Sequence, residues 1–517
     1  MFAYISRRIL VSILTLLVAS FLMYMLTALS ADPLAELRAS NALNKDELIR
    51  RRTELLDLDT HPVIRWVKWV AGVGGCLLPF AFDCSLGVSV EGFAVAELLP
   101  PAMVSTIRLV TVATVLAIVL GVAVGMVTAL RQNSAFDISV TFVAFFLYSL
   151  PSFLIAVLLK EFGAIGFNNF IQQGDPPQIG PVWIIVITLA SGLLWAMLLG
   201  GTRMRRLVTF ASAAAITAGS LIYINVTDFF RQPHLGPVLL FVFIGLTVVG
   251  VTTLTASLRN RRALLAAGIT GAIAYICYFA LQGLFDVSSV WTLIFLGIAA
   301  VVVSALVGLV VGLFGPDKGQ VIRAATITGF FASLFVLMDR FMQAWPAYLE
   351  HPRIRNRPMA TAQDATTGYS ADVWGEGIDQ MMHFLLPTIS LLLISFAFYT
   401  RFARAGLLEV FNQDYIRTAR AKGLSEQTIV MRHAFRNMLI PLTTIVAADV
   451  GALLGGALIT ERVFAISGMG AMYINGLRQL DLNPIMGYFL VIAILAIAFN
   501  FIADLMYAVL DPRVRVK

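Results

Sequence analysis

The polar segment 409–441 carries the densest group of side chains in the second half of the chain that could recognise another molecule. It contains five Lys or Arg residues, and Arg401 and Arg404 come just before it. Gly423 suits the left-handed position that follows a helix end, and Ser425 can cap a following helix. We therefore predict two short helices joined at Gly423. Their chemistry is non-covalent docking of a soluble partner, although a basic loop that docks nothing has the same charge pattern.

Motifs for covalent or metal chemistry are missing from the sequence. There is no GxxxxGK[ST] phosphate loop, no HExxH and no GxSxG, so ATP hydrolysis by the phosphate-loop route is excluded. The five histidines are scattered without metal-ligand spacing. These absences predict a protein that is not an enzyme and that holds no metal or cofactor of its own.

Ionisable side chains inside apolar stretches are the other functional signal, because charges at membrane depth are costly and usually face a cavity or a bundle interior. Asp449 lies close in the sequence to Gly451 and Gly455, whose small size lets helices approach closely. One hypothesis places Asp449, Gly451 and Gly455 along a substrate path or its gate. The other makes Asp449 a buried polar contact between helices. Pro151, in another apolar stretch, either bends a helix that lines a path or only distorts packing.

The composition requires membrane helices to position these residues. Hydrophobic residues make up 59% of the 517 residues and charged residues 13%, and the mean hydropathy is +0.85. We predict an all-α integral membrane protein, because an α-helix satisfies its backbone hydrogen bonds within the bilayer. The net charge of +7 indicates basic loops on the inner side of a membrane rather than nucleic-acid binding.

About twelve stretches are long and apolar enough to cross about 30 Å of hydrocarbon. They cover residues 9–29, 103–130, 138–160, 182–200, 207–224, 237–257, 263–282, 291–314, 322–341, 384–400, 439–460 and 485–510. Three turns between residues 201 and 323 hold eight Lys or Arg residues, whereas the two opposing turns hold only Arg231. The basic turns are therefore predicted to be cytoplasmic, which also puts both chain ends inside.

Two long polar segments, 31–102 and 342–382, are predicted to lie on the exterior side. Residues 44–57 have the pattern of an amphipathic surface helix. Cys76 and Cys84 fall in the first segment, on the oxidising side, where either a disulfide or two partly buried thiols would fit. Cys277 lies in a later span and is predicted to pack there.

Residues 414–441 read DYIRTARAKGLSEQTIVMRHAFRNMLIP, which resembles the cytoplasmic coupling loop of the dipeptide/oligopeptide permease family of ABC importers. The Glu-Ala-Ala run of the general importer loop reads Arg417-Thr418-Ala419 here, and a common Leu-Pro reads Phe435-Arg436, as in the peptide branch. The resemblance implies an ATPase-coupling site made of Asp414, Tyr415, Arg417, Thr418, Ala419, Arg420, Ala421, Lys422, Gly423, Leu424, Ser425 and Arg436.

The resemblance reaches both ends of the chain and covers a little over half of it. Residues 4–33 look like the family's first span, 95–153 like its second and third, and 385–515 like the rest. Because most members have six spans, we expect a six-helix type I importer permease core interrupted by about six additional helices. The expected parts are core 1–160 with exterior loop 31–102, insert 161–341, exterior loop 342–382, and core 383–517 with coupling loop 401–438.

The inserted stretch shows no ionisable cluster in its apolar cores that would make a second pathway. We interpret it as a peripheral scaffold that packs outside the pore and displays exterior loops. The sharper alternative is that its helices form a lateral site or hold a binding protein.

The resemblance implies a permease subunit of a bacterial inner membrane, multi-pass with both termini cytoplasmic, that imports di- or oligopeptides by alternating access. The implied partners are a second permease subunit, two ABC ATPase subunits that bind ATP and Mg²⁺, an extracytoplasmic substrate-binding lipoprotein and membrane lipid, with no nucleic acid. Two alternatives stay open. One is an ABC importer of another small solute, such as nickel or haem. The other is a twelve-span secondary transporter, which would show repeat symmetry and carboxylates in both halves.

Overall fold

The computed structural model describes residues 2–30, 32–41, 43–77, 84–173, 177–286, 289–313 and 315–510. Across these ranges the regular structure is helical, apart from one isolated bridge between Val88 and Ala94. The predicted all-α fold is confirmed. The elements are α1 (Phe2–Ser30), α2 (Ala35–Ala39), α3 (Lys45–Leu55), α4 (Pro62–Leu77), α5 (Val95–Leu130), α6 (Ala135–Ser149), α7 (Ser152–Leu158), η1 (Leu159–Gly166), α8 (Phe167–Gln173), α9 (Pro181–Leu199), α10 (Arg203–Val226), α11 (Gly236–Thr255), α12 (Arg261–Ala280), α13 (Gln282–Asp286), α14 (Val290–Gly312), α15 (Lys318–Glu350), α16 (Val373–Phe411), α17 (Asp414–Ala421), α18 (Glu426–Thr428), η2 (Ile429–Ala434), α19 (Phe435–Val463), α20 (Met469–Gln479) and α21 (Leu482–Leu510).

Eleven helical segments within the described ranges are long and apolar enough to cross a membrane. They lie in α1, α5, α7–α8, α9, α10, α11, α12, α14, α15, α16 and α21. The remaining expected span, 439–460, lies in α19, a further helix of 29 residues. Together these helices agree with the expectation of about twelve crossings.

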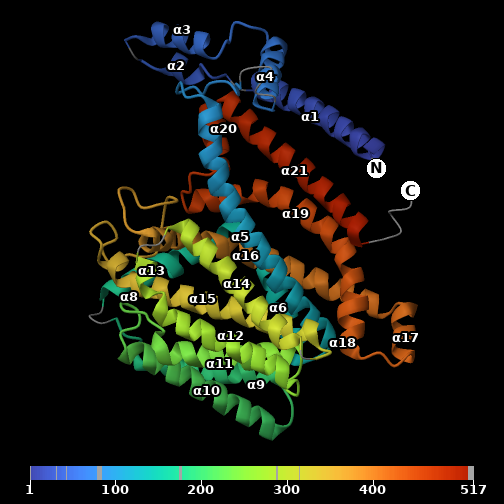
Figure 1. Cartoon of the computed structure of the whole chain (residues 1–517). Helices are drawn as coiled ribbons and strands as arrows, with labels where there is room; N and C mark the ends of the chain where they lie inside the picture. The colour runs from blue at the N-terminus through green and yellow to red at the C-terminus, as the bar shows by residue number, and fades with distance from the viewer. Residues whose placement is uncertain are drawn as a thin grey trace.

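Helices α5 and α16 form the long central pair of the core (Figure 1). Gly121 and Gly125 of α5 allow the contact, because a Cβ at these positions would lie 2.8 Å from the Tyr399 Cβ and 2.6 Å from the Thr400 carbonyl oxygen. The 36 residues of α5 extend about 54 Å, well beyond the hydrocarbon layer. The helix therefore begins before the apolar stretch 103–130. The two prolines at residues 100–101 precede that stretch but lie inside the helix.

The third core span is a broken helix. α6 ends at Ser149, and Pro151 occupies the N-cap position of α7. A helix can start directly after a proline, because the N–H that proline lacks would have no partner within the helix at that position. From Ser152 the helix runs through the π-helical stretch η1 into α8 and ends at Gln173, so residue 160 is not the end of a helix as expected.

The segment between α1 and α5 forms a small region at one edge of the molecule (Figure 1). α3 matches the surface helix expected at 44–57, and a disulfide joins Cys76 to Cys84. Trp66 Nε1 donates to Ser20 Oγ of α1 at 3.3 Å, and Val90 N donates to the Asp481 carboxylate at 2.7 Å. These contacts fix the region to α1 and to the turn before α21.

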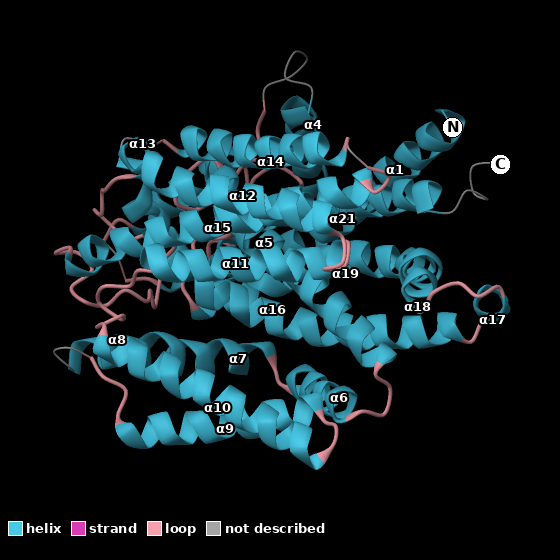
Figure 2. Cartoon of the chain, turned by 60° about the horizontal axis from the view of Figure 1, so that its bottom comes forward, coloured by secondary structure: helices cyan, strands magenta, loops and turns pink. Residues whose placement is uncertain are grey.

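The six inserted helices form two groups (Figure 2). α9 and α10 form a hairpin that meets the core chiefly at α6, and no residue of α10 is buried. α11, α12, α14 and α15 form the second group, and α15 contacts α16. A single carboxylate, Asp339, is fully buried in this group and accepts hydrogen bonds from Leu235 N at 2.7 Å and Tyr278 OH at 2.9 Å. It joins three helices and is not part of an ionisable cluster.

The segment between the insert and the core is more helical than expected. α15 continues to Glu350 and α16 starts at Val373, so only 351–372 of the expected loop 342–382 is irregular. The helices extend because their ends bury Tyr348, Trp374 and Ile378 beyond the apolar stretch.

The start of α1, the end of α21 and helices α17–α18 lie at the same end of the molecule (Figures 1 and 2). Helices α8 and α13 lie toward the opposite end in both views. Residues 414–434 therefore lie on the same side as the two ends of the chain, as expected if an even number of helices crosses the membrane before this segment and after it.

Candidate coupling loop and transport pathway

The segment 412–434 forms a helical elbow with Gly423 at its turn. α17 ends at Ala421, and Gly423 has a φ of +76°, the left-handed conformation that glycine adopts without steric cost. Gly423 N donates to the Arg420 carbonyl at 2.9 Å, which closes the end of α17. Ser425 Oγ accepts from Thr428 N at 3.3 Å and so caps α18. These are the two helices and the turn that the sequence predicts, although the second helix runs through Pro441 into α19.

One face of the elbow packs against the ends of the core helices. Ile416 and Ile429 are fully buried, together with Leu407 of α16 and Met438 of α19. Ala419, expected in the coupling site, is also buried and packs on this inner face. The other expected residues are exposed: Asp414, Tyr415, Arg417, Thr418, Arg420, Ala421, Lys422, Gly423, Leu424, Ser425 and Arg436.

Two exposed polar contacts join the parts of the elbow. Arg420 Nε donates to Glu426 Oε1 at 3.0 Å across the Gly423 turn. Asn437 Nδ2 donates to Tyr415 OH at 2.8 Å and connects α17 to α19. Exposed pairs contribute at most about 1 kcal/mol each, so the buried face provides most of the elbow's stability. Arg417, which lies 3.6 Å from Asp414, keeps its guanidinium at the surface.

An ion pair that sequence reasoning missed anchors the end of α16. Arg404 donates to both carboxylate oxygens of Asp137 in α6, at 2.6 and 2.9 Å, and the Asp137 side chain is only 3% exposed. Arg401, one turn away, stacks on Phe145 at 4.1 Å and on Tyr148. These two arginines therefore fix α16 to α6 rather than adding to the free charge of the elbow.

The pathway candidates have different surroundings in the structure and do not form one cluster. Asp449 accepts a hydrogen bond from Tyr399 OH at 2.6 Å and so connects α19 to α16. Gly451 faces Ala496 of α21, with 3.6 Å between an added Cβ and the Ala496 Cβ. Pro151 is exposed at the break before α7. Gly455 falls in α19, where its surroundings are outside the described residues.

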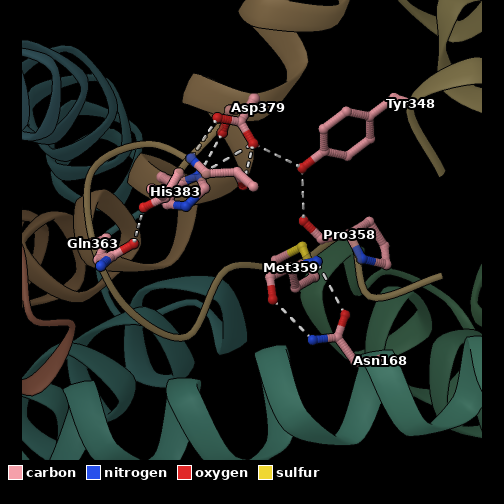
Figure 3. A network of polar contacts seen from close by, with 9 residues as sticks. Asn168, Tyr348, Pro358, Met359, Gln363, Asp379 and His383 are labelled. Carbon is pink, nitrogen blue, oxygen red and sulfur yellow. Dashed lines mark hydrogen bonds and ion pairs between the residues drawn. The ribbon is translucent and has the colours of Figure 1, made fainter. Parts of the chain in front are cut away.

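A buried polar network holds the loop 351–372 onto the helices (Figure 3). The Asp379 carboxylate of α16 accepts from Thr366 N at 2.9 Å and from Thr366 Oγ1 at 2.6 Å. Tyr348 OH lies 3.3 Å from both the Asp379 carboxylate and the Pro358 carbonyl. Asn168 of α8 pairs with the Met359 backbone through its Nδ2 at 2.8 Å and its Oδ1 at 3.0 Å. The loop is therefore joined to α8, α15 and α16.

The same loop reaches the ends of two core helices. Gln363 N donates to the Ala465 carbonyl at 3.2 Å, and Ser105 Oγ of α5 donates to Asp364 at 2.9 Å. Burial, with the Asp379 carboxylate nearby, raises the pKa of Tyr369 in this loop to about 12. No sequence signal identifies these contacts, because the partners lie on separate elements and the loop has no motif.

Glu461 is a further buried carboxylate that joins several helices. Its side chain is fully buried and accepts from Thr106 Oγ1 of α5 at 2.6 Å and from Gly470 N at 2.8 Å. It also accepts from Ala471 N at 3.3 Å, so the carboxylate lies at the N-terminus of α20, where the helix dipole favours negative charge. The carboxylate of Glu461 therefore joins α19 to α5 and α20.

Glu461→Ala should lower the free energy of unfolding by about 2–4 kcal/mol, because it leaves three buried donors without an acceptor. Glu461→Gln keeps one carbonyl acceptor and should cost less than Glu461→Ala. Thermal unfolding of the purified subunit in detergent measures both, with Arg462→Ala, an exposed neighbour, as the matched control. Equal unfolding temperatures for Glu461→Ala and Arg462→Ala would contradict the junction.

Residues 290–516 match the sequence model of a family described as binding-protein-dependent transport system inner membrane component. The match includes α14 and α15, ahead of residue 383, where we expect the core to resume. The chain is 41% identical over 145 residues to the di/tripeptide transport system permease protein DppB of Pseudomonas aeruginosa, across 28% of this chain and 43% of the relative. It is 38% identical over 136 residues to the oligopeptide transport system permease protein AppB of Bacillus subtilis, across 26% and 43%.

A longer alignment decides the family. The chain is 33% identical over 237 residues to the dipeptide transport system permease protein DppB of Escherichia coli strain K12, across 43% of this chain and 70% of the relative. The chain belongs to the dipeptide/oligopeptide permease family of ABC importers. As a member of this family it is a multi-pass membrane permease.

Proposed function

We propose that this permease is the membrane-spanning subunit of an ATP-driven importer of di- and oligopeptides. The observation that carries the proposal is the similarity to the dipeptide permease of Escherichia coli across 70% of that relative. The di/tripeptide and oligopeptide permeases of Pseudomonas aeruginosa and Bacillus subtilis support the same substrate class.

The elbow 412–434 is proposed to couple the subunit to ATPase subunits in the cytoplasm. Its exposed face presents Arg417, Arg420 and Lys422, while its buried face holds Ile416 and Ile429 against the core. A body fixed in this way can transmit a push to α16 and α19 without bending. ATP binding by the partners must then favour the outward-facing conformation by a few kcal/mol to drive alternating access.

The complete importer is proposed to contain a second permease subunit, two ABC ATPases that hold ATP and Mg²⁺, and a binding lipoprotein outside the membrane. The subunit is placed in a bacterial inner membrane, with both termini cytoplasmic. The basic turns near residues 203–206 and 259–262 favour this orientation. Asp449, Gly451, Gly455 and Pro151 are the proposed pathway residues. The hydrogen bond from Tyr399 fits equally the alternative role of Asp449 as a polar contact between helices.

The inserted helices are proposed to act first as a scaffold. The hairpin α9–α10 meets the core chiefly at α6, which fits a peripheral position. α15 and α16 hold the loop 351–372 through Asp379 and Tyr348, and the loop in turn contacts α5 through Ser105. This path links the insert to the exterior ends of the core helices, where a binding protein would dock.

Uptake in reconstituted vesicles tests the substrate class. The subunit is purified with its partner permease, ATPases and binding protein, and placed in vesicles that contain ATP. The proposal expects uptake of a labelled di- or tripeptide that stops without ATP. ATP-dependent uptake of nickel or haem with no peptide uptake would assign the subunit to another solute.

Charge reversal on the elbow should uncouple transport from ATP hydrolysis. Arg417→Glu with Arg420→Glu places two negative charges where the partner ATPase would meet positive ones, and like charges across an interface cost several kcal/mol. Peptide uptake should fall at least about tenfold, which corresponds to about 1.4 kcal/mol, with the subunit still in the membrane. Wild-type uptake by a correctly assembled variant complex would argue against the docking role. Arg50→Glu with Arg51→Glu, two exposed arginines on the surface helix α3, is the matched control.

A further inference from the structure

Helices α12, α14 and α15 are in close contact over one half of their length. On α14, a Cβ at Gly308 would lie 2.7 Å from the Ile322 Cα of α15. At mid-length, a Cβ at Gly329 of α15 would lie 1.8 Å from the Ser304 Oγ of α14 and 3.1 Å from Thr270 of α12. Backbones can approach this closely only where side chains are absent or small.

Beyond Gly329, toward the end where α12 stops and α14 starts, the three helices separate and leave a cavity of about 640 Å³. Its wall is almost entirely hydrocarbon and includes Ile273, Leu293 and Phe330. Ser304 and Ser333 also line it, but each donates its hydroxyl to a carbonyl of its own helix, at 2.6 and 2.8 Å. The wall therefore offers few polar partners to water.

The cavity lies along a membrane-crossing helix, so lipid surrounds this part of the protein. α14 is an apolar helix of 23 residues, about 35 Å long, that crosses the membrane. Its outer face exposes Phe295 and Leu306, which do not line the cavity, as expected for side chains that meet lipid. A space with so few polar partners binds water poorly, and an empty one is destabilising, so hydrocarbon fits it best.

We propose that this cavity binds one acyl chain of a bilayer phospholipid. Its volume falls within the range of sites for single small ligands. A spanning helix of a partner protein is about 10 Å wide and 30 Å long and displaces several times that volume. The insert thus carries a lateral lipid site. This proposal adds lipid binding to the scaffold role of the insert.

Gly297 provides a direct way to close the site. It lines the cavity, and a Cβ at this position would meet no atom within 4 Å. Gly297→Phe therefore puts a ring into the cavity without a backbone clash. Gly245 of α11 is also exposed with open space around its Cβ position, but it does not line the cavity. Gly245→Phe is the matched control.

The experiment uses the purified subunit in nanodiscs that contain a phospholipid with a photoreactive group in its acyl chain. After illumination, mass spectrometry locates the labelled residues. The proposal expects labelling concentrated on cavity-lining residues such as Ile273 and Leu293, above the level at Phe295 and Leu306. Gly297→Phe should lower the cavity labelling about tenfold, a change equivalent to about 1.4 kcal/mol of binding, whereas Gly245→Phe should leave it unchanged.

Cys277, whose thiol is free, also lines the cavity and provides a second readout. An apolar thiol reagent should modify it faster after detergent removes the lipid than in nanodiscs. Equal labelling of the cavity and the outer face, or unchanged labelling in Gly297→Phe, would overturn the proposal. If a partner subunit in a lipid-free complex slows the modification of Cys277, the cavity would be a protein contact and the lipid proposal would be wrong.

Discussion

Replacing Gly423 with proline is expected to abolish peptide import while the subunit remains folded in the membrane. Gly423 has a φ of +76°, and proline restricts φ to about −65°. Proline also removes the N–H that donates to the Arg420 carbonyl at 2.9 Å. It further disfavours the backbone conformation of the preceding Lys422, which has a φ of −77° and a ψ of 0°. The turn between α17 and α18 must then open, so Arg420 and Glu426 separate and the elbow loses its rigidity.

The core should tolerate this change, because no atom lies within 4 Å of a Cβ at Gly423 and the residue is exposed. Uptake by reconstituted vesicles should fall at least about tenfold, equivalent to about 1.4 kcal/mol in the transport barrier. Gly423→Asn is the matched control, because asparagine visits the left-handed region more readily than other side chains, and it should retain most of the uptake. Normal uptake by Gly423→Pro would show that the turn does not transmit force.

Removing one partner of the Asp137–Arg404 pair is expected to cause the largest loss of stability among the single substitutions considered. The Asp137 side chain is 3% exposed and accepts both hydrogen bonds of the Arg404 guanidinium. Asp137→Asn leaves a partly buried cation without its counter-charge, which costs about 3–5 kcal/mol in buried pairs. The end of α16 that leads into the elbow then loses its attachment to α6.

A double-mutant cycle separates the pair from its surroundings. Asp137→Asn combined with Arg404→Gln should be more stable than the sum of the single losses predicts, with a coupling energy of about 1–3 kcal/mol. Thermal unfolding in detergent gives these values. Arg401→Gln, one turn away, removes only the ring contacts and should cost about 1 kcal/mol. Additive losses in the cycle would mean that the two residues act independently.

The elbow was predictable from sequence because its signals are local. Gly423 ends one helix and Ser425 starts the next, and both act within four residues of their own position. The spans were predictable for a similar reason, since hydropathy reports whether a stretch can lie in hydrocarbon. It does not report where a helix ends outside the membrane, which is why α5 and α15 run past the expected ends.

Contacts between distant residues were not predictable. Arg404 precedes the basic segment directly and was counted with its charges, and Asp137 stands 267 positions earlier with no pattern that links them. Asp137 also follows Ser134, so it fits a local helix-capping pattern and suggests no further partner. The same holds for Asn168 and Met359, which lie 191 positions apart. Such pairs depend on the packing of whole helices.

A photo-cross-linker at position 422, in place of the exposed Lys422, tests the coupling role of the elbow in the intact importer complex. We expect a cross-link to an ATPase subunit, because the elbow is the segment that we propose the ATPases move. A cross-link to the binding lipoprotein, or none in a complex that imports peptide, would contradict this coupling role.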